Sequence, residues 1–419
     1  MRFPRTQVPN TETNYFCMTF DLPIDQDYHM IAYEPLIDNA NVLHHILLYG
    51  CKDPNGVRIP EPELCGMSEA NNDCTDTIGT WAVGIPGICL PENLGFRFGR
   101  GGYTRVRLET HYHNPENRAD YTDASGLKLY YQPSTPQMND LSIFVTGQLM
   151  LEIPPGQPRV EHVGVCGSAC TRQMIIKPAY ITSAFNHMHY LGRAMSIEIF
   201  RNGRLYEKVT DEEFYSYDNP IQHDKEPFLE LLPGDEIRTT CVFNSMSSKR
   251  WTYWGEGTFD EMCFGFLTVF PKDAFVQDAS CSSFGPLDEC DLKAGKPIGE
   301  CNWGQFTNPA DPQTYKWWSE VEKSCNTNGF CRPECREIAT VVKNHPCMKG
   351  DAAAVVNWLL GTSKKGNDLL ARLGSCGHDM TCPDCKDSCP DEPYVADGAG
   401  AISATALVTM FPLVIALLF

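Results

Sequence analysis

The chain has 419 residues, 42% of them hydrophobic and 11% aromatic, and a formal net charge of −19 at pH 7. This length is sufficient for two or three domains with full hydrophobic cores. The acidic balance argues against nucleic acid as a partner, because nucleic-acid-binding proteins need a basic surface.

The cysteine content and the first residues bear on the compartment. Twenty cysteines are too many for a reducing compartment and predict the disulfide framework of a secreted or cell-surface protein. The stretch from Met1 to Gln7 contains no apolar run that could serve as a signal peptide. The natural start of the protein is therefore expected to be missing from this sequence.

Residues 15–132 are predicted to form β-strands. In residues 105–111, less polar side chains alternate with charged or polar ones, which is the period of a strand. His111 and His113 fall on the charged face, so they are not expected to be buried core histidines. A second strand-like run covers residues 126–131, and the Pro-containing polar stretch 133–140 is the best linker candidate.

Residues 141–280 are again predicted to be β structure. Ile197 and Ile199 alternate with polar neighbours, and the Asn202-Gly203 pair that follows predicts a hairpin with a type I′ turn. Pro233, Gly234 and Asp235 mark another turn. No helical pattern of useful length occurs before residue 300. We therefore predict two all-β domains, residues 1–133 and 134–285.

The region after residue 285 differs in composition. Residues 281–395 hold more than half of the cysteines. A helix is predicted from Pro312 to Lys323 with Asp311 as its N-cap, and another from Asp351 to Leu360, ended by Gly361. Residues 286–395 are thus predicted to be a cysteine-rich, partly helical appendage. The Cys382–Cys385 pair has the spacing of a redox motif or half a zinc site, but an oxidising compartment favours a structural disulfide.

The end of the chain has the features of a membrane-attachment signal. Small residues at 396–401 precede an apolar run at 402–419, and no basic residue follows Lys386. This pattern predicts a GPI-attachment signal with Asp397 or Gly398 as candidate attachment positions. The alternative is a short membrane-spanning anchor that contains Pro412. The protein is expected in the secretory pathway, anchored on the extracellular or lumenal face of a membrane.

Six of the 11 histidines occur in three tight clusters, which are His44-His45, His111-Tyr112-His113 and His187-Met188-His189. Imidazole is the commonest metal ligand among side chains, and the thioether of a methionine such as Met262 suits reduced copper. Each cluster alone is moderate evidence, because a single HxH motif is structural or incidental about half the time, and most methionines are core residues. Together they indicate copper, and with it oxygen or electron chemistry.

Strand geometry constrains how these clusters can bind a metal. Residues i and i+2 share a face of a strand, so His187 and His189 can reach one metal ion together. The adjacent His44 and His45 point to opposite sides of a regular strand, so both bind one ion only at a strand end or a distortion. Cys263 directly follows Met262 and could pin its strand through a disulfide, with Cys241 as one possible partner.

Four local sequences resemble the copper type II, ascorbate-dependent monooxygenases, and they occur in the family's order. They are His44-His45-Ile-Leu-Leu-Tyr-Gly-Cys51, Glu109-Thr-His111-Tyr-His-Asn-Pro115, His187-Met-His189-Tyr-Leu-Gly-Arg193 and Asp260-Glu-Met262-Cys263. Asn14-Tyr-Phe-Cys17 is also similar to the family's first strand and first cysteine. The resemblance covers about residues 12–285. The family includes the dopamine β-monooxygenase-like branch, its orphan relatives and the peptidylglycine hydroxylases.

The resemblance implies two antiparallel, jelly-roll-like β-sandwiches that each hold one copper ion and face each other across a solvent-filled cleft. His44, His45 and His111 would bind an electron-storing copper, and His187, His189 and Met262 the catalytic copper that takes up O₂. All-imidazole sites hold copper in either oxidation state, whereas a thioether favours Cu(I). Ascorbate would supply two electrons, and one oxygen atom of O₂ would enter a C–H bond of a small molecule. His113 would face the cleft or support a ligand.

The resemblance also implies a disulfide framework, which spacing alone cannot establish. The implied pairs are Cys17–Cys65, Cys51–Cys74, Cys166–Cys281 and Cys241–Cys263. Cys170 would reach into the appendage, and Cys89 has no evident partner.

The chain departs from the family pattern where substrate would bind. The dopamine-type enzymes carry an additional N-terminal domain, whereas this chain starts at the first copper domain. The peptide-amidating branch holds its substrate's carboxylate with an arginine, an asparagine and a tyrosine, and the matching residues here are Phe185, Phe264 and Phe266. This replacement argues against a peptidylglycine-type hydroxylase and favours an aromatic amine, as in catecholamine metabolism, or a similar apolar substrate. Alternatively, the three phenylalanines are core residues.

Two other classes of function fit the sequence less well than a copper monooxygenase. A non-catalytic copper-binding surface protein is disfavoured because all six ligand positions are present. A zinc hydrolase would need a general base close to its histidines, as in an HExxH motif, and the sequence contains no such motif.

Overall fold

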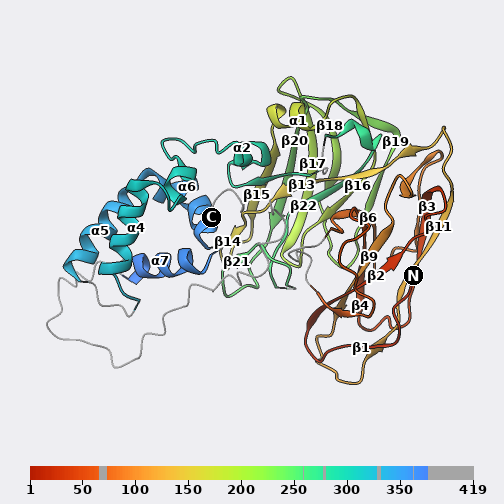
Figure 1. Cartoon of the computed structure of the whole chain (residues 1–419), viewed down its shortest axis with the longest axis horizontal. Helices are drawn as coiled ribbons and strands as arrows, with labels where there is room; N and C mark the ends of the chain where they lie inside the picture. Colours follow the sequence, from red (N-terminus) through yellow and green to blue (C-terminus); the bar gives the residue numbers. More distant parts are fainter. Residues whose placement is uncertain (66–72, 258, 277–279, 328–331, 362, 376–419) are drawn as a thin grey trace. The chain divides into compact units, whose positions relative to one another are not determined.

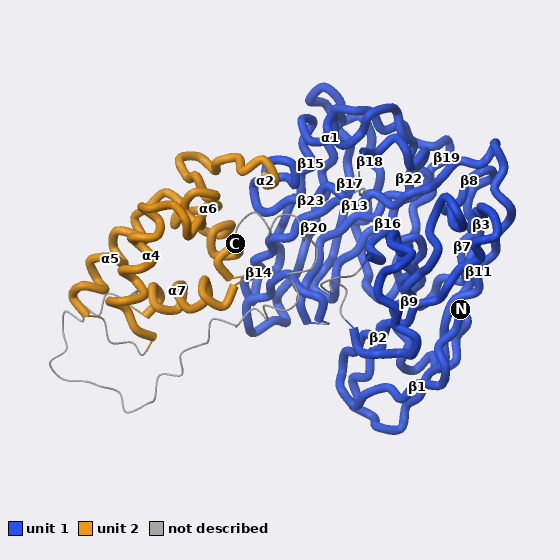
Figure 2. Tube along the Cα trace, viewed as in Figure 1, with its two compact units in different colours: residues 1–291 blue, residues 292–419 orange. Residues whose placement is uncertain are grey.

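The computed structural model describes residues 1–375 except 66–72, 258, 277–279, 328–331 and 362 (Figure 1). Strands dominate up to residue 288, and helices dominate after it, so the predicted all-β class with a helical appendage is confirmed. The chain divides into two compact units, residues 1–291 and 292–419 (Figure 2). Both predicted metal sites lie in the first unit.

The first sandwich of unit 1 consists of two sheets that enclose one core. One sheet has the order β5-β2-β9-β4-β6, and the other has the order β11-β3-β8-β12, with β7 paired to β3 and a separate β1–β10 pair. The core joins Ile46 and Leu108 of the first sheet to Met30 and Phe96 of the second. The strands are β1 Thr6–Gln7, β2 Thr13–Asp21, β3 Asp27–Leu36, β4 Leu43–Cys51, β5 Glu63–Leu64, β6 Asp76–Ala82, β7 Ile88–Cys89, β8 Leu94–Gly99, β9 Arg105–His113, β10 Thr122–Asp123, β11 Gly126–Pro133 and β12 Asn139–Asp140.

The second sandwich has a six-stranded sheet, β19-β16-β22-β13-β23-β24, and a four-stranded sheet, β15-β20-β17-β18, with a β14–β21 pair beside them. Its core joins Phe144 and Leu267 of the larger sheet to Ile197 and Ile237 of the smaller one. The elements are β13 Ser142–Gln148, β14 Glu152–Ile153, β15 Val160–Cys166, α1 Ser168–Met174, β16 Ala179–His187, β17 Gly192–Arg201, β18 Arg204–Glu212, β19 Gln222–Leu231, β20 Glu236–Phe243, β21 Thr252–Tyr253, β22 Phe264–Phe270, η1 Lys272–Ala274, β23 Ser280–Phe284 and β24 Leu287–Asp288.

Both predicted turns are present, and the linker candidate is partly ordered into a sheet. Asn202 and Gly203 both have positive φ between the paired Arg201 and Arg204, as a type I′ hairpin requires. The amide of Asp235 donates to the carbonyl of Leu232, which closes the turn over Pro233 and Gly234. Within residues 133–140, β12 pairs in parallel with β8 of the first sandwich.

Strand β9 corrects one expectation from the sequence. Arg105, Arg107 and Glu109 are as buried as the apolar residues between them, and His111 is only 1% exposed. The charged face is therefore buried as well, because β9 lies between β2 and β4 at the centre of its sheet. Buried charge needs partners, and Arg105 meets Asp73 at 2.8 Å while Arg107 meets Glu109 at 3.6 Å.

The four disulfides implied by the resemblance are confirmed, namely Cys17–Cys65, Cys51–Cys74, Cys166–Cys281 and Cys241–Cys263. Cys170 pairs with Cys290, just beyond β24. Cys89 is unpaired and exposed. Disulfides at this density indicate folding in an oxidising compartment, as in the secretory pathway.

Unit 2 is helical and carries the Cys301–Cys347 and Cys325–Cys335 disulfides. The side chain of Asp311 caps α4 by accepting from the amides of Gln313 and Thr314, as predicted. The second predicted helix is α6. The helices are α2 Glu289–Lys293, which crosses the boundary of the units, α3 Trp303–Thr307, α4 Pro312–Ser324, α5 Pro333–Asn344, η2 Pro346–Met348, α6 Gly350–Gly361 and α7 Lys364–Ser375.

Two expectations concern residues that the structure does not describe. The Cys382–Cys385 pair and the C-terminal attachment signal both lie in residues 376–419, outside the described part of the chain. Among the described residues, no helix combines the length and the apolar character needed to cross a membrane.

Candidate metal centre

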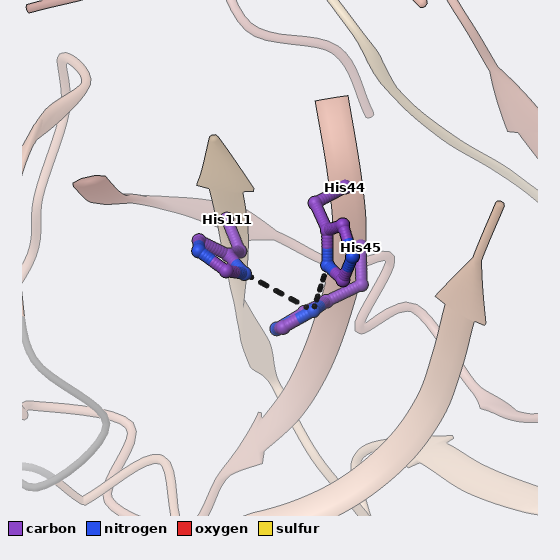
Figure 3. Close-up of side chains that lie close together, drawn as sticks. All are labelled: His44, His45 and His111. Carbon is purple, nitrogen blue, oxygen red and sulfur yellow. Dashed lines mark hydrogen bonds between the residues drawn. The ribbon is translucent and has the colours of Figure 1, made fainter. Parts of the chain in front are cut away.

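The first histidine site is built by two neighbouring strands of the first sandwich. His45 on β4 lies directly opposite His111 on β9, and the register shifts by one residue between Leu43 and His45. His44 is the extra residue of this β-bulge, and a bulge lets two adjacent side chains turn toward the same side. The strand distortion required by the sequence argument is therefore present. Figure 3 shows the three imidazoles converging from the two strands.

The geometry of this site suits a metal ion. The Nδ1 atom of His45 lies 3.2 Å from Nδ1 of His44 and 3.3 Å from Nδ1 of His111, and the candidate ligand atoms all lie within 4.8 Å of one another. Two imidazole nitrogens that bind a tetrahedral metal at about 2.0–2.1 Å stand about 3.3–3.4 Å apart. The spacing of the three rings therefore fits one shared cation.

The electrostatics of the first site keep its imidazoles neutral. Burial, helped by the neighbouring His113, lowers the pKa of His44 to about 4. Burial followed by repulsion from the other histidines holds the pKa values of His45 and His111 well below the ordinary value. A neutral imidazole keeps the lone pair that a metal needs, so the site is ready to bind a cation at neutral pH.

The surroundings of the first site distinguish His113 from its neighbours. The Tyr15 ring stacks on the His111 ring at 4.5 Å. The His113 ring is 6.0 Å from the His44 ring, and His113 is not in the group of converging ligand atoms. His113 therefore borders the site.

The second histidine site lies in the second sandwich. His187 is the last residue of β16, and His189 lies in the turn that follows. Their rings are 5.3 Å apart and nearly perpendicular. Burial is the main cause that lowers the pKa of His187 to about 3 and that of His189 to about 4. Both side chains therefore remain neutral and able to bind a metal.

The segment Asp260-Glu261-Met262 holds His189 in place. Nδ1 of His189 lies 2.8 Å from the carbonyl oxygen of Asp260. A carbonyl only accepts, so Nδ1 carries the proton and Nε2 keeps its lone pair for a metal. Met262, two residues after this carbonyl, is 1% exposed, and its neighbour Cys263 is bonded to Cys241.

Glu261 is a functional candidate that the sequence analysis missed. Its buried carboxylate accepts the backbone N–H groups of His189 at 2.9 Å and Leu191 at 2.6 Å. Burial raises the pKa of Glu261 to about 8, although these N–H groups favour the ionised form. Its position directly before the predicted ligand Met262 was the available signal.

A cavity of about 770 Å³ lies between the two sandwiches, and its described lining residues include none of the candidate metal ligands. Phe185 and Phe266, which are direct cross-strand partners, line it from the second sandwich. The Phe266 ring is 6.3 Å from the His187 ring. Phe264 is 5% exposed and is not among the lining residues. Two of the three phenylalanines therefore form a cavity wall, and the third is a core residue.

Both sandwiches match domains of one known protein family. Residues 1–119 match the copper type II ascorbate-dependent monooxygenase N-terminal domain, and residues 139–291 match the C-terminal domain of the same family.

Individual relatives are similar over about two thirds of the chain. MOXD1 homolog 1 of Drosophila melanogaster is 30% identical over 66% of this chain and 42% of its own length. Human dopamine beta-hydroxylase is 29% identical over 64% of this chain and 45% of its own length. The tyramine beta-hydroxylase of Caenorhabditis briggsae is 29% identical over 63% of this chain and 46% of its own length. The aligned part of this chain therefore spans about half the length of these relatives.

Proposed function

Because the chain belongs to the copper type II ascorbate-dependent monooxygenase family, we propose that it inserts one oxygen atom of O₂ into a C–H bond of a small molecule. Ascorbate provides two electrons and two protons, so that the second oxygen atom leaves as water. The observation that carries the proposal is the pair of histidine sites, whose neutral imidazoles are arranged to hold metal.

Each site has a distinct part in this proposal. His44, His45 and His111 hold one copper ion, and His187, His189 and Met262 hold the other. The bound copper ions supply one-electron redox chemistry and the activation of O₂. Three imidazoles tolerate both oxidation states, whereas the thioether of Met262 favours the reduced ion. The hydrogen bond from His189 to Asp260 orients the ring so that Nε2 is the ligand atom.

The cavity beside His187 supports an aromatic amine or a similar apolar molecule as substrate. Phe185 and Phe266 offer flat apolar surface next to the second site, and Asp224 and Glu226 add carboxylates to the lining. Aromatic faces and carboxylates suit a ring that carries an ammonium group. Among the described residues that line the cavity, Lys225 is the cation and there is no arginine, so the forked guanidinium of the peptide-amidating branch is not reproduced there.

The test is ascorbate-dependent O₂ consumption by the copper-loaded protein, with product identification and copper counted per chain. Phenethylamines and glycine-extended peptides are compared in parallel. Hydroxylated amine without peptide product is the expected result. Peptide hydroxylation would contradict the assignment of the cavity, and two bound copper ions without turnover on a broad panel of apolar substrates would contradict the catalytic proposal.

A further inference from the structure

One aromatic side chain lies between the two histidine sites. The Tyr217 ring stacks on the His44 ring of the first sandwich at 4.8 Å, with an interplanar angle of 29°. The same ring is 5.4 Å from the His189 ring and 6.2 Å from the His187 ring of the second sandwich. Tyr217 thus contacts predicted ligands of both metal sites.

The loop that carries Tyr217 is fixed to the second site. It covers residues 213–221 between β18 and β19. The hydroxyl of Tyr215 donates to the carbonyl of Met188 at 2.6 Å and accepts from its amide at 2.9 Å. Met188 is the residue between the two histidines of the second site, so these two hydrogen bonds attach the loop to the backbone of that site.

The same loop also reaches the outer edge of the first site. Oδ1 of Asp218 is 3.9 Å from Nε2 of His44, the nitrogen opposite the one that converges on His45. Tyr190 packs its ring edge against Tyr217 at 4.7 Å and donates its hydroxyl to Asp218 at 3.2 Å. Two adjacent loop residues therefore meet one ligand of the other sandwich, and Tyr190 supports both.

We propose that Tyr217 is a positioning residue that holds the two metal sites in apposition, with its ring as the bridge. The inference rests on the proposed occupancy of both sites by copper. The ring makes the contacts to the histidines, so a phenylalanine should replace it and an aliphatic side chain should not. Tyr15, whose hydroxyl donates to the carbonyl of Glu256 at 2.8 Å, forms a separate link between the sandwiches.

The experiment measures hydrogen exchange of the metal-free full chain at residues 44–46 and 187–189, without any turnover. The variants are Tyr217→Leu and Tyr217→Phe. The matched control is Phe214→Leu, because Phe214 is an aromatic residue of the same loop that is 88% exposed. We expect equal exchange in the wild type, Tyr217→Phe and Phe214→Leu, and faster exchange at residues 44–46 in Tyr217→Leu.

Each outcome decides one claim. Faster exchange at residues 44–46 in Tyr217→Leu that is restored in Tyr217→Phe supports the bridge, and unchanged exchange in Tyr217→Leu refutes it. The metal-free protein is used so that a change in copper affinity cannot produce the result. Fewer than two copper ions bound per wild-type chain would instead count against the two-metal function and would leave the exchange result untouched.

Discussion

Met262 and Met188 offer a direct contrast at the scale of single residues, because both are buried and only Met262 is proposed as a metal ligand. Met262→Ile keeps the volume but removes the proposed thioether ligand, whereas Met188→Leu changes only packing. Volume-conserving swaps cost less than about 1.5 kcal/mol, so both variants should fold. We expect Met262→Ile to lose ascorbate-dependent turnover and Met188→Leu to retain it. Normal turnover in Met262→Ile would remove Met262 from the site.

Above pH 8, where the side chain of Glu261 is ionised, its carboxylate should support copper binding at the second site only. Glu261→Gln keeps the shape but replaces an acceptor of two backbone N–H groups with an amide that is half donor. Loss of such a support typically weakens metal binding about 10–100-fold. Copper titration against a competing chelator should show that loss for one of two ions. The exposed Glu213→Gln is the matched control, and equal losses in both variants would contradict this role.

The lowered pKa values of the site histidines predict how the metal-free protein responds to acid. Unfolded histidine has a pKa near 6.5, whereas those of folded His44, His187 and His189 are about 4, 3 and 4. Between these values the unfolded chain binds protons that the folded chain does not. Stability is therefore retained above about pH 6.5 and lost as the pH falls toward 4. Urea midpoints of metal-free wild type and His187→Gln should show a smaller loss in the variant; identical pH profiles would refute the assignment.

Phe185 on β16 and Phe264 on β22 have different surroundings, although nothing in the sequence distinguished them. Phe264 is buried, so Phe264→Ala should cost about 3–5 kcal/mol of unfolding free energy. Phe185 lines the cavity, so Phe185→Ala should cost less stability and should raise KM for an aromatic substrate at least tenfold. Thermal unfolding and steady-state kinetics on both variants test this difference. A larger stability loss in Phe185→Ala would mean that the cavity wall is misassigned.

The sequence predicted the secondary-structure elements better than it predicted the burial and the contacts of their side chains. The alternation in residues 105–111 correctly indicated a strand, but periodicity cannot reveal that both faces of β9 are covered. Asn202-Gly203 was readable because few residue pairs accept two positive φ angles. The bulge at His44 was foreseen only as a condition for joint binding. The hydrogen bonds of His189 and Glu261 to distant segments depend on tertiary packing, which local patterns do not encode.

At the scale of the whole molecule, the first unit is predicted to fold without the second. Residues 1–291 contain both members of five disulfides, including Cys170–Cys290. A chain that ends at Asp291 should therefore bind as much copper as the full chain. A chain that ends at residue 285 lacks Cys290, so its Cys170 should form mixed disulfides. The substitution Cys170→Ser should abolish these mixed disulfides. Copper content and non-reducing electrophoresis provide the test, and copper loss in the longer form would contradict it.

The bulge in β4 is fixed by the packing of the apolar residues on either side of it. Leu43 and Ile46 are an odd number of residues apart, yet both are buried in the core of the first sandwich. A regular strand would place them on opposite faces, so the extra residue His44 is what allows both to be buried. Straightening the strand would remove one of them from this core. The apolar core therefore sets the positions of the paired histidines without a metal ion, so the proposed copper would bind without any rearrangement of the strand.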